Sequence, residues 1–409
     1  MELHVRPIRR DEFEEYVAVL EAGVGRRMTD EALEDATADY DVERLFAAFD
    51  GERMVGGTGS EALELTVPGP ALLPAARITL AAVLPTHRRR GISTELNVQQ
   101  LHDLRARGEP LAVFTTTGPG LYRRVGYSPA TFAQEVELDL VHARLAVPAS
   151  DGSGRLLAED ELSETLPPIF ERHRLAQPGQ ISRTPLFWRF WLDDRERYRK
   201  GEPGDRMAVV FEDGGGDAQG YLTYRLRPGP PRDQPVDALV VEDLVAVTEP
   251  SRRELWRYCL AFHQARSLLA HNLPADEPLL FMLDDPRHLR ATRLREFVWL
   301  RLVDVPAALE ARRYTGSGSV ALEVTDPVCS ENAGRFRLEV EDGVAECGRT
   351  DGPAELALDV ADLAAVYLGG SSVSRLARAG RIEELASGAI RRLDALFASW
   401  PAPWTVSDW

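Results

Sequence analysis

A ten-residue segment between a strand-like and a helix-like pattern constrains the fold of this chain most. Residues 83–92 read Val-Leu-Pro-Thr-His-Arg-Arg-Arg-Gly-Ile. The preceding residues 76–83 are mostly apolar and bounded by turn residues, which predicts a strand. Residues 93–107 carry apolar side chains at the 3.6-residue spacing of a helix. A strand, a glycine-containing turn and a helix in that order are typical of an α/β fold.

The same segment has the chemistry of an anion site. A helix that begins after Gly91 leaves backbone N–H groups at its N-terminus, where the helix dipole is positive, and such a terminus suits a pyrophosphate. Gly91 allows close approach because it has no Cβ. Arg88, Arg89 and Arg90 add positive charge. The alternative is a basic, solvated loop before a helix, but the flanking strand, glycine and helix favour the phosphate site.

Composition narrows the class of protein. The 409 residues carry a formal net charge of −17, which argues against a general nucleic-acid binder and favours attraction of cationic substrates. Three widely spaced cysteines, Cys259, Cys329 and Cys347, predict neither a disulfide framework nor a metal site. We see no secretion signal and no apolar stretch of membrane-spanning length. The expected location is cytoplasmic, without a membrane partner.

Two linker-like stretches divide the chain. Residues 148–154 are rich in Pro, Ser, Gly and Asp, and residues 315–319 read Thr-Gly-Ser-Gly-Ser. The predicted domains are therefore 1–147, 155–313 and 314–409. In the second we expect, among others, a helix over 251–269 and a short strand over 279–283. In the third we expect strands over 320–324, 335–340 and 356–360, followed by helices over 362–367, 371–379 and 382–385.

The end of the sequence, Pro-Trp-Thr-Val-Ser-Asp-Trp, is apolar and aromatic. Chain ends are usually polar and frayed unless something holds them. We therefore expect this tail to dock into a pocket and to carry the α-carboxylate of Trp409 with it. The alternative is an aromatic tail that only caps a hydrophobic groove. Asp408 would add negative charge for a cationic substrate, or it is an exposed acid without a role.

The motifs resemble a known family. Arg88-x-x-Gly91-x-Ser93 is similar to the pyrophosphate loop of GNAT N-acetyltransferases, with Ser93 where that family has Gly or Ala. The strings over 85–91 and 121–127, Pro-Thr-His-Arg-Arg-Arg-Gly and Leu-Tyr-Arg-Arg-Val-Gly-Tyr, resemble Eis-type (enhanced intracellular survival) acetyltransferases of actinobacteria. The resemblance covers essentially the whole chain. It implies an α/β (α+β) fold with tandem GNAT folds followed by a sterol-carrier-protein-type C-terminal domain.

The resemblance also implies the site residues. Tyr122 would be the general acid and the Trp409 carboxylate the general base, whereas the residues alone do not choose between Tyr122 and Tyr127. Asp408 would contact the substrate, and no metal is implied. Acetyl-CoA, the cosubstrate, would lie along Ala81, Ala82, Val83, Arg88, Arg89, Arg90, Gly91, Ile92, Ser93, Thr94, Thr117 and Gly118.

The resulting hypothesis is an acetyl-CoA-dependent N-acetyltransferase. It would acetylate amino groups of polyamine-type small molecules, including aminoglycosides at multiple positions, by direct transfer. The alternatives are a lipid or sterol carrier and an acyl-CoA sensor that use the C-terminal domain. The second domain has no Arg-x-x-Gly loop, so we interpret it as a scaffold without cofactor, and its Asp-Asp-Pro-Arg-His run at 284–288 as a turn. The resemblance further implies a homo-oligomer, a hexamer, with no nucleic-acid partner.

Overall fold

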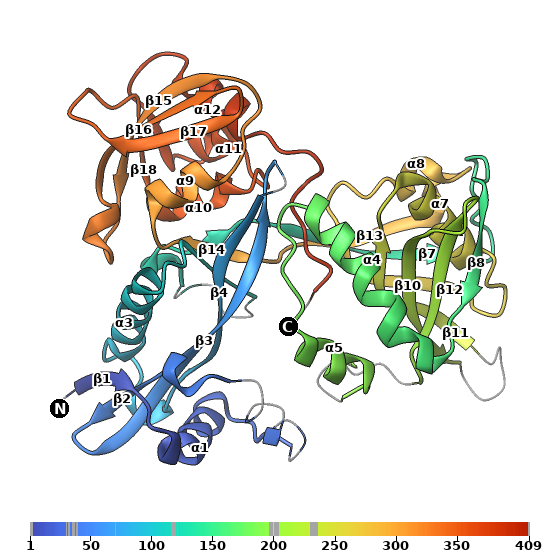
Figure 1. The fold of residues 1–409 in the computed structure, drawn as a ribbon, viewed down its shortest axis with the longest axis horizontal. Helices are drawn as coiled ribbons and strands as arrows, with labels where there is room; N and C mark the ends of the chain where they lie inside the picture. The colour runs from blue at the N-terminus through green and yellow to red at the C-terminus, as the bar shows by residue number, and fades with distance from the viewer. Residues whose placement is uncertain are drawn as a thin grey trace. The chain divides into compact units, whose positions relative to one another are not determined.

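The computed structural model describes residues 3–407, apart from residues 30, 32, 35, 36, 38, 39, 70, 116–119, 121, 196–198, 200–203 and 230–235. Its contacts group the chain into two compact units (Figure 1). One unit contains Met1–Thr131 and Phe297–Trp400, and the other contains Phe132–Glu296 and Pro401–Trp409. Each unit is therefore built from two separate stretches of chain.

The first unit contains a seven-stranded mixed sheet with the order β1-β2-β3-β4-β5-β14-β6. Helices α1 (Phe13–Val24) and α3 (Ile92–Ala106) pack against it, through apolar residues such as Leu20 and Leu101. The strands are β1 (Leu3–Pro7), β2 (Leu45–Asp50), β3 (Arg53–Val67), β4 (Ala71–Val83), β5 (Leu111–Phe114), β6 (Ser128–Pro129) and β14 (Trp299–Leu302).

The C-terminal segment of the same unit has its own five-stranded sheet with the order β17-β16-β15-β18-β19. Its strands are β15 (Gly318–Thr325), β16 (Gly334–Glu341), β17 (Val344–Arg349), β18 (Leu356–Asp359) and β19 (Ile382–Glu384). Its helices are α9 (Val305–Ala311), α10 (Val360–Tyr367), α11 (Val373–Arg378) and α12 (Ala389–Phe397). Every residue of α10 is buried, which makes this helix the centre of the segment.

The second unit is a seven-stranded sheet with the order β13-β7-β12-β11-β10-β9-β8. Its strands are β7 (Phe132–Asp139), β8 (Gly152–Leu156), β9 (Met207–Asp213), β10 (Ala218–Pro228), β11 (Val236–Ala246), β12 (Ser267–Pro274) and β13 (Leu289–Glu296). Helices α4 (Leu162–Ala176), α5 (Pro185–Leu192), α7 (Glu249–Leu260) and α8 (Leu279–Met282) complete it. Trp256 and Leu268 lie in its core.

Two strands pair in a sheet other than the sheet of the strands before them in the chain. β7 follows the first segment but pairs with β12 and β13, and β14 follows the second segment but pairs with β5 and β6. The compact units therefore do not follow the predicted boundaries at 147 and 313. The division into domains 1–147, 155–313 and 314–409 stays a prediction about which parts fold independently.

Four predicted elements differ from the structure. The predicted strand over 279–283 is the helix α8, and the predicted helix over 382–385 is the strand β19, which pairs with β18. Both are apolar or mixed runs too short for periodicity to decide. The helix predicted over 251–269 ends at Leu260, and residue 267 already belongs to β12. The linker 148–154 overlaps β8, which begins at Gly152.

Candidate active site

The loop between β4 and α3 has an unusual backbone. After β4 ends at Val83, a single 3-10 turn over Pro85–His87 leads to Arg89 and Gly91, whose φ angles are +62° and +83°. A side chain in this left-handed region costs roughly 1–2 kcal/mol, and glycine avoids the cost. A Cβ built at Gly91 would meet no atom within 4 Å, so glycine is needed here for its conformation.

The loop opens onto a cavity of about 740 Å³ in the first unit. Gly91 is the N-cap of α3 and offers no side-chain acceptor to the first turn of the helix. That first turn, from Ile92 to Thr94, lines the cavity. N–H groups at such a terminus are hydrogen-bond donors in a positive potential, which fits an anionic phosphate group.

The three arginines of the loop have different environments. Arg88 donates to the carbonyl oxygens of Gly23, at 2.5 Å, and Val83, at 3.3 Å, so part of its hydrogen-bonding capacity braces the loop. Arg89 lines the cavity and is exposed. Arg90 is also exposed but is not among the described residues that line the cavity.

His87 supports the loop from within. It is buried, its Nδ1 lies 2.8 Å from Thr86 Oγ1, and its Nε2 lies 3.8 Å from a carboxylate oxygen of Asp50. These contacts place His87 where it can brace the loop.

In the described part of the chain, no strand pairs with the end of β4, beside the loop, on the side where β5 lies. Its parallel pairing with β5 runs from Ala75↔Leu111 to Arg77↔Val113, whereas β4 itself continues to Val83. Residues 81–83, Ala-Ala-Val, line the cavity. On its other side β4 pairs with β3, with a register shift between Gly57 and Gly59. An extended amide chain could therefore add to this edge as a further strand does.

Tyr122 lies in the 3-10 turn Tyr122–Val125 and lines the same cavity. Its ring packs on Phe114 with 4.3 Å between ring centroids, and burial raises the pKa of its hydroxyl. Tyr127 is fully buried and is not among the described lining residues. Its Oη has no hydrogen-bond partner among the described residues, and burial also raises its pKa. The two tyrosines therefore have different surroundings.

Four predicted site residues lie outside the described residues: Thr117, Gly118, Asp408 and Trp409. The structure brings the others together around one cavity, except Arg90, and adds lining residues that the sequence did not single out. Gly23, Gly57, Asn97 and Arg124 are among these additions. They come from α1, β3, α3 and the Tyr122 turn, and only Arg124 lies within a motif that the sequence analysis quoted.

The described part of the tail is bound within the second unit. Trp404 is 1% exposed, and its Nε1 donates to Asn272 Oδ1 at 2.9 Å. Asn272 Nδ2 in turn donates to the backbone carbonyls of Thr405, at 3.0 Å, and Val406, at 3.1 Å. Arg183 Nε donates to Ser407 Oγ at 3.0 Å. The tail is thus held by its backbone and by its side chains.

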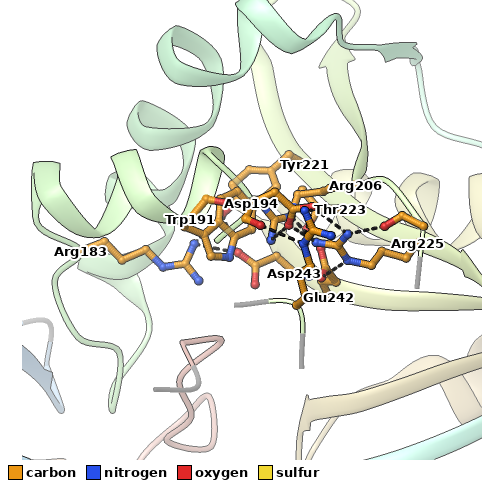
Figure 2. A network of polar contacts seen from close by, with 11 residues as sticks. Arg183, Trp191, Asp194, Arg206, Tyr221, Thr223, Arg225, Glu242 and Asp243 are labelled. Atoms are coloured by element: carbon orange, nitrogen blue, oxygen red, sulfur yellow. Dashed lines mark hydrogen bonds and ion pairs between the residues drawn. The ribbon is translucent and has the colours of Figure 1, made fainter. Parts of the chain in front are cut away.

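Arg183 belongs to a buried polar network beside the tail (Figure 2). Its guanidinium lies 2.7 Å from Asp243 Oδ2, and Tyr221 donates to the same carboxylate oxygen at 3.2 Å. In the neighbouring cluster, Glu242 accepts from Arg225 and from Arg206, each at 2.7 Å. Breaking such a buried pair is costly, about 3–5 kcal/mol, because one charge is left uncompensated. The network therefore makes a rigid support for Ser407.

The described residues of the second unit form no counterpart of the phosphate loop. Between β11 and α7, Thr248 caps the helix by accepting from Ser251 N at 3.3 Å, and the acidic Glu249 stands in the first turn. A capped, acidic N-terminus does not favour an anion. This agrees with a second segment that serves as a scaffold.

The run at 284–288 is a turn in the structure. Asp285 accepts from Arg287 N at 3.0 Å and caps the 3-10 helix Pro286–His288. Its ion pair with Arg287 and the backbone hydrogen bond lower the pKa of its carboxyl group. The described residues contain no group of three or more His, Cys, Asp or Glu side chains placed to hold a metal. No helix among them is long and apolar enough to cross a membrane.

Comparisons with known families agree with this architecture. Residues 4–130 and residues 179–302 each match a family described as acetyltransferase (GNAT) domain. Residues 305–406 match the family described as sterol carrier protein domain. The chain is therefore an N-acetyltransferase of the GNAT class with a C-terminal domain of the sterol carrier type, and the GNAT fold implies the use of acetyl-CoA. The predicted fold class and enzyme class are confirmed.

Individual relatives narrow the family. The chain is 36% identical over 411 residues to an uncharacterized N-acetyltransferase of Streptomyces coelicolor, covering 99% of both chains. It is 36% identical over 361 residues to N-acetyltransferase Eis of Mycobacterium bovis, covering 85% of this chain and 84% of that one. The structure is similar to Eis1 from Mycobacterium abscessus, with a TM-score of 0.88, 32% identity and coverage of 99% and 100%. The chain belongs to the Eis family of N-acetyltransferases, as the motifs predicted.

Proposed function

We propose that this enzyme transfers the acetyl group of acetyl-CoA directly to amino groups of polycationic small molecules. The acceptor class is polyamine-like, and the resemblance to Eis-type enzymes suggests aminoglycosides acetylated at more than one position. One observation carries the proposal: the Gly91 loop, the end of β4 and Tyr122 all line one cavity. The net charge of −17 supports attraction of a cationic acceptor.

The residues present fit acetyl-CoA, which supplies an acetyl group activated as a thioester. The uncapped first turn of α3 and the Arg89 guanidinium would hold the pyrophosphate. The backbone from Ala81 to Val83 would pair with the pantetheine amides. We assign the remaining predicted contacts, Arg88, Arg90, Thr117 and Gly118, to the same role by resemblance.

The proton transfers define the two catalytic roles. An ammonium group must lose a proton before its nitrogen can attack the acetyl carbon, and we assign that proton to the α-carboxylate of Trp409. An unperturbed α-carboxyl group has a pKa of about 3.5 and is a weak base, but burial raises that value. As the C–S bond breaks, Tyr122 donates its Oη proton to the sulfur, and the second proton that the nitrogen loses as the amide forms restores the Tyr122 hydroxyl. Burial of Tyr122 keeps this proton in place at neutral pH.

Two further roles follow from the resemblance. Asp408, next to the terminal residue, would attract the cationic acceptor by its charge. The enzyme would assemble into a homo-oligomer, a hexamer, which light scattering coupled to size-exclusion chromatography would test.

The carrier alternative is weaker. A lipid carrier needs an enclosed apolar cavity. One cavity in the C-terminal segment has a volume of about 560 Å³ and is lined by the charged Asp359, Arg381 and Glu383 beside Leu358 and Ile382. These charges do not suit an acyl chain or a sterol.

A CoA-release assay tests the proposed function. The panel contains aminoglycosides, linear polyamines and lysine peptides. On a good acceptor, Tyr122→Phe should lower kcat about 10²–10⁴-fold, the usual contribution of general acid catalysis, with CoA affinity unchanged. Tyr127→Phe is the matched control, because Tyr127 belongs to the same aromatic cluster. Its hydroxyl has no hydrogen-bond partner among the described residues, so its removal should break no bond. If Tyr122→Phe and Tyr127→Phe turn over at the same rate, the proton donor is a group other than Tyr122.

A further inference from the structure

The turn that carries Tyr122 rests on the C-terminal segment. Arg123, the next residue, reaches Asp362 on α10, with 2.5 Å between Nη2 and Oδ1. Its other terminal nitrogen donates at 3.1 Å to Oγ of Ser128, the first residue of β6, which follows the turn. Arg123 therefore links the turn and the start of β6 to one carboxylate that lies 239 residues away in the sequence.

Asp362 is built to hold that link. Its side chain is 1% exposed, and it also accepts from Arg381 Nε and Nη2, each at 3.2 Å. A buried carboxylate is costly unless it is paired and hydrogen-bonded, so both guanidinium groups are strongly favoured in these positions. Because α10 is buried throughout, the carboxylate itself is fixed by packing. Asp362 is thus a rigid point to which Arg123 is bound.

A second brace lies under the same turn. Gly126 has a φ of +88°, and a Cβ there would sit 2.6 Å from the guanidinium carbon of Arg301. Arg301 is bound to Asp326 at 2.5 Å, and both side chains are fully buried. Asp326, like Asp362, belongs to the C-terminal segment. Two buried carboxylates from this segment therefore support the turn through two arginines.

We propose that Asp362 is a positioning residue for the reaction: through Arg123 it holds the Tyr122 hydroxyl where a proton donor is needed. The inference rests on the proposed role of Tyr122 as the general acid. It gives the sterol-carrier-type domain a function in this enzyme that requires no lipid. The domain orients the acid of the first GNAT domain.

The test combines Asp362→Asn with a second variant from the other side of the contact. Asp362→Asn keeps the shape and removes the charge. Arg123→Leu removes the link while Asp362 keeps Arg381, and since Arg123 is 37% exposed, this variant should fold even if Asp362→Asn does not. Both should lower kcat about tenfold to hundredfold, the usual consequence of a misplacement near 1 Å, with CoA affinity unchanged. Arg123→Lys should recover part of the loss.

The control variant is Asp394→Asn in the same segment. Asp394 accepts from the backbone N–H groups of Val373 and Ser374, the start of α11, and no hydrogen bond or ion pair among the described residues joins it to the Tyr122 turn. The Asp394→Asn variant should have a lower thermal stability. Its kcat should equal that of the wild type when it is measured at a temperature where the variant is folded. A loss of kcat in Asp394→Asn as large as in Asp362→Asn would overturn the inference, because it would show a general effect of loosening the segment.

Combining the variants separates the role of Tyr122 as the general acid from the role of Asp362 as a positioning residue. In a Tyr122→Phe background, Asp362→Asn should lower kcat no further, whereas an independent structural role would add its own loss. If Tyr122→Phe lowers kcat but Asp362→Asn and Arg123→Leu do not, the positioning role is wrong and the general acid stands. If Tyr122→Phe turns over normally, the general acid and the positioning role both fall.

Discussion

At the scale of single residues, the conformation of Gly91 is the most specific requirement of the phosphate loop. Gly91→Val should lower CoA affinity at least tenfold, about 1.4 kcal/mol, because it strains the backbone at a φ of +83° and places a side chain where a phosphate must approach. Calorimetric titration with CoA measures this effect.

Gly108 provides the matched control at the other end of the same helix. Its φ is +74°, and a Cβ there would also meet no atom within 4 Å. Gly108→Val should therefore cause a similar loss of thermal stability while CoA affinity stays at the wild-type value. Unchanged CoA affinity in both variants would remove the loop from the cofactor site.

Residue types and spacing predicted the core of this site but not its supports. Arg88, Arg89 and Gly91 stand between a strand and a helix, and this context is local, so the motif could be found from the sequence. Gly23 accepts a hydrogen bond from Arg88 across 65 positions, and Asp362 contacts Arg123 across 239. Such pairs are set by tertiary packing, and no spacing within one sequence indicates them.

At the scale of elements, periodicity worked where a helix or strand was long. The helix predicted over 93–107 is α3, Ile92–Ala106 in the structure, and the strand predicted over 335–340 is β16, Gly334–Glu341. The sequence could not show which sheet β7 would join, because edge and partner depend on non-local contacts. The amphipathic α12 and the helix α4, with two internal prolines, were missed altogether.

Helix α4 carries a buried titratable group that links stability to pH. His173 Nδ1 lies 3.0 Å from the carbonyl oxygen of Ala246, and the ring packs edge-on against Trp404 of the tail. Burial, with a smaller effect from Arg252, lowers the pKa of His173 from 6.5 to about 4. The folded unit thus favours the neutral ring. This stabilisation is complete above pH 6.5 and is lost as the pH falls from 6.5 toward 4.

The lowered pKa of His173 corresponds to a loss of roughly 3 kcal/mol in the free energy of unfolding between these pH values, at about 1.36 kcal/mol per pKa unit. His173→Phe should therefore reduce the loss of unfolding free energy between pH 7 and pH 4, measured by urea denaturation followed through tryptophan fluorescence. Identical pH profiles for wild type and His173→Phe would contradict the linkage.

At the scale of the whole molecule, each compact unit is built from stretches that are not consecutive in the sequence. β7 and β14 are exchanged between the two sheets, and Pro401–Trp409 is grouped with the second unit although the preceding residues belong to the first. The two linker-like stretches were visible from composition, but this exchange was not, because it involves only hydrogen bonds between distant strands. Neither of the two seven-stranded sheets is therefore made from one continuous segment.

The bound tail makes the terminal carboxylate separately testable. Trp404, Thr405, Val406 and Ser407 are buried, so their contacts should survive a change made after Trp409. Adding a few residues after Trp409 moves the charge, and amidating the terminus neutralises it in place. If the carboxylate is the base, both changes should lower kcat about 10²–10⁴-fold with CoA affinity and thermal stability unchanged.

The same extension at the N-terminus is the control and should leave turnover at the wild-type rate. If the tail only caps a groove, amidation should be nearly silent, because the indole rings and the hydrogen bonds of Asn272 stay in place. Deleting residues 408 and 409 would harm either arrangement and distinguishes nothing. A C-terminally extended enzyme that turns over at the untagged rate would exclude the terminal carboxylate from the chemistry and leave the acceptor's proton to another base.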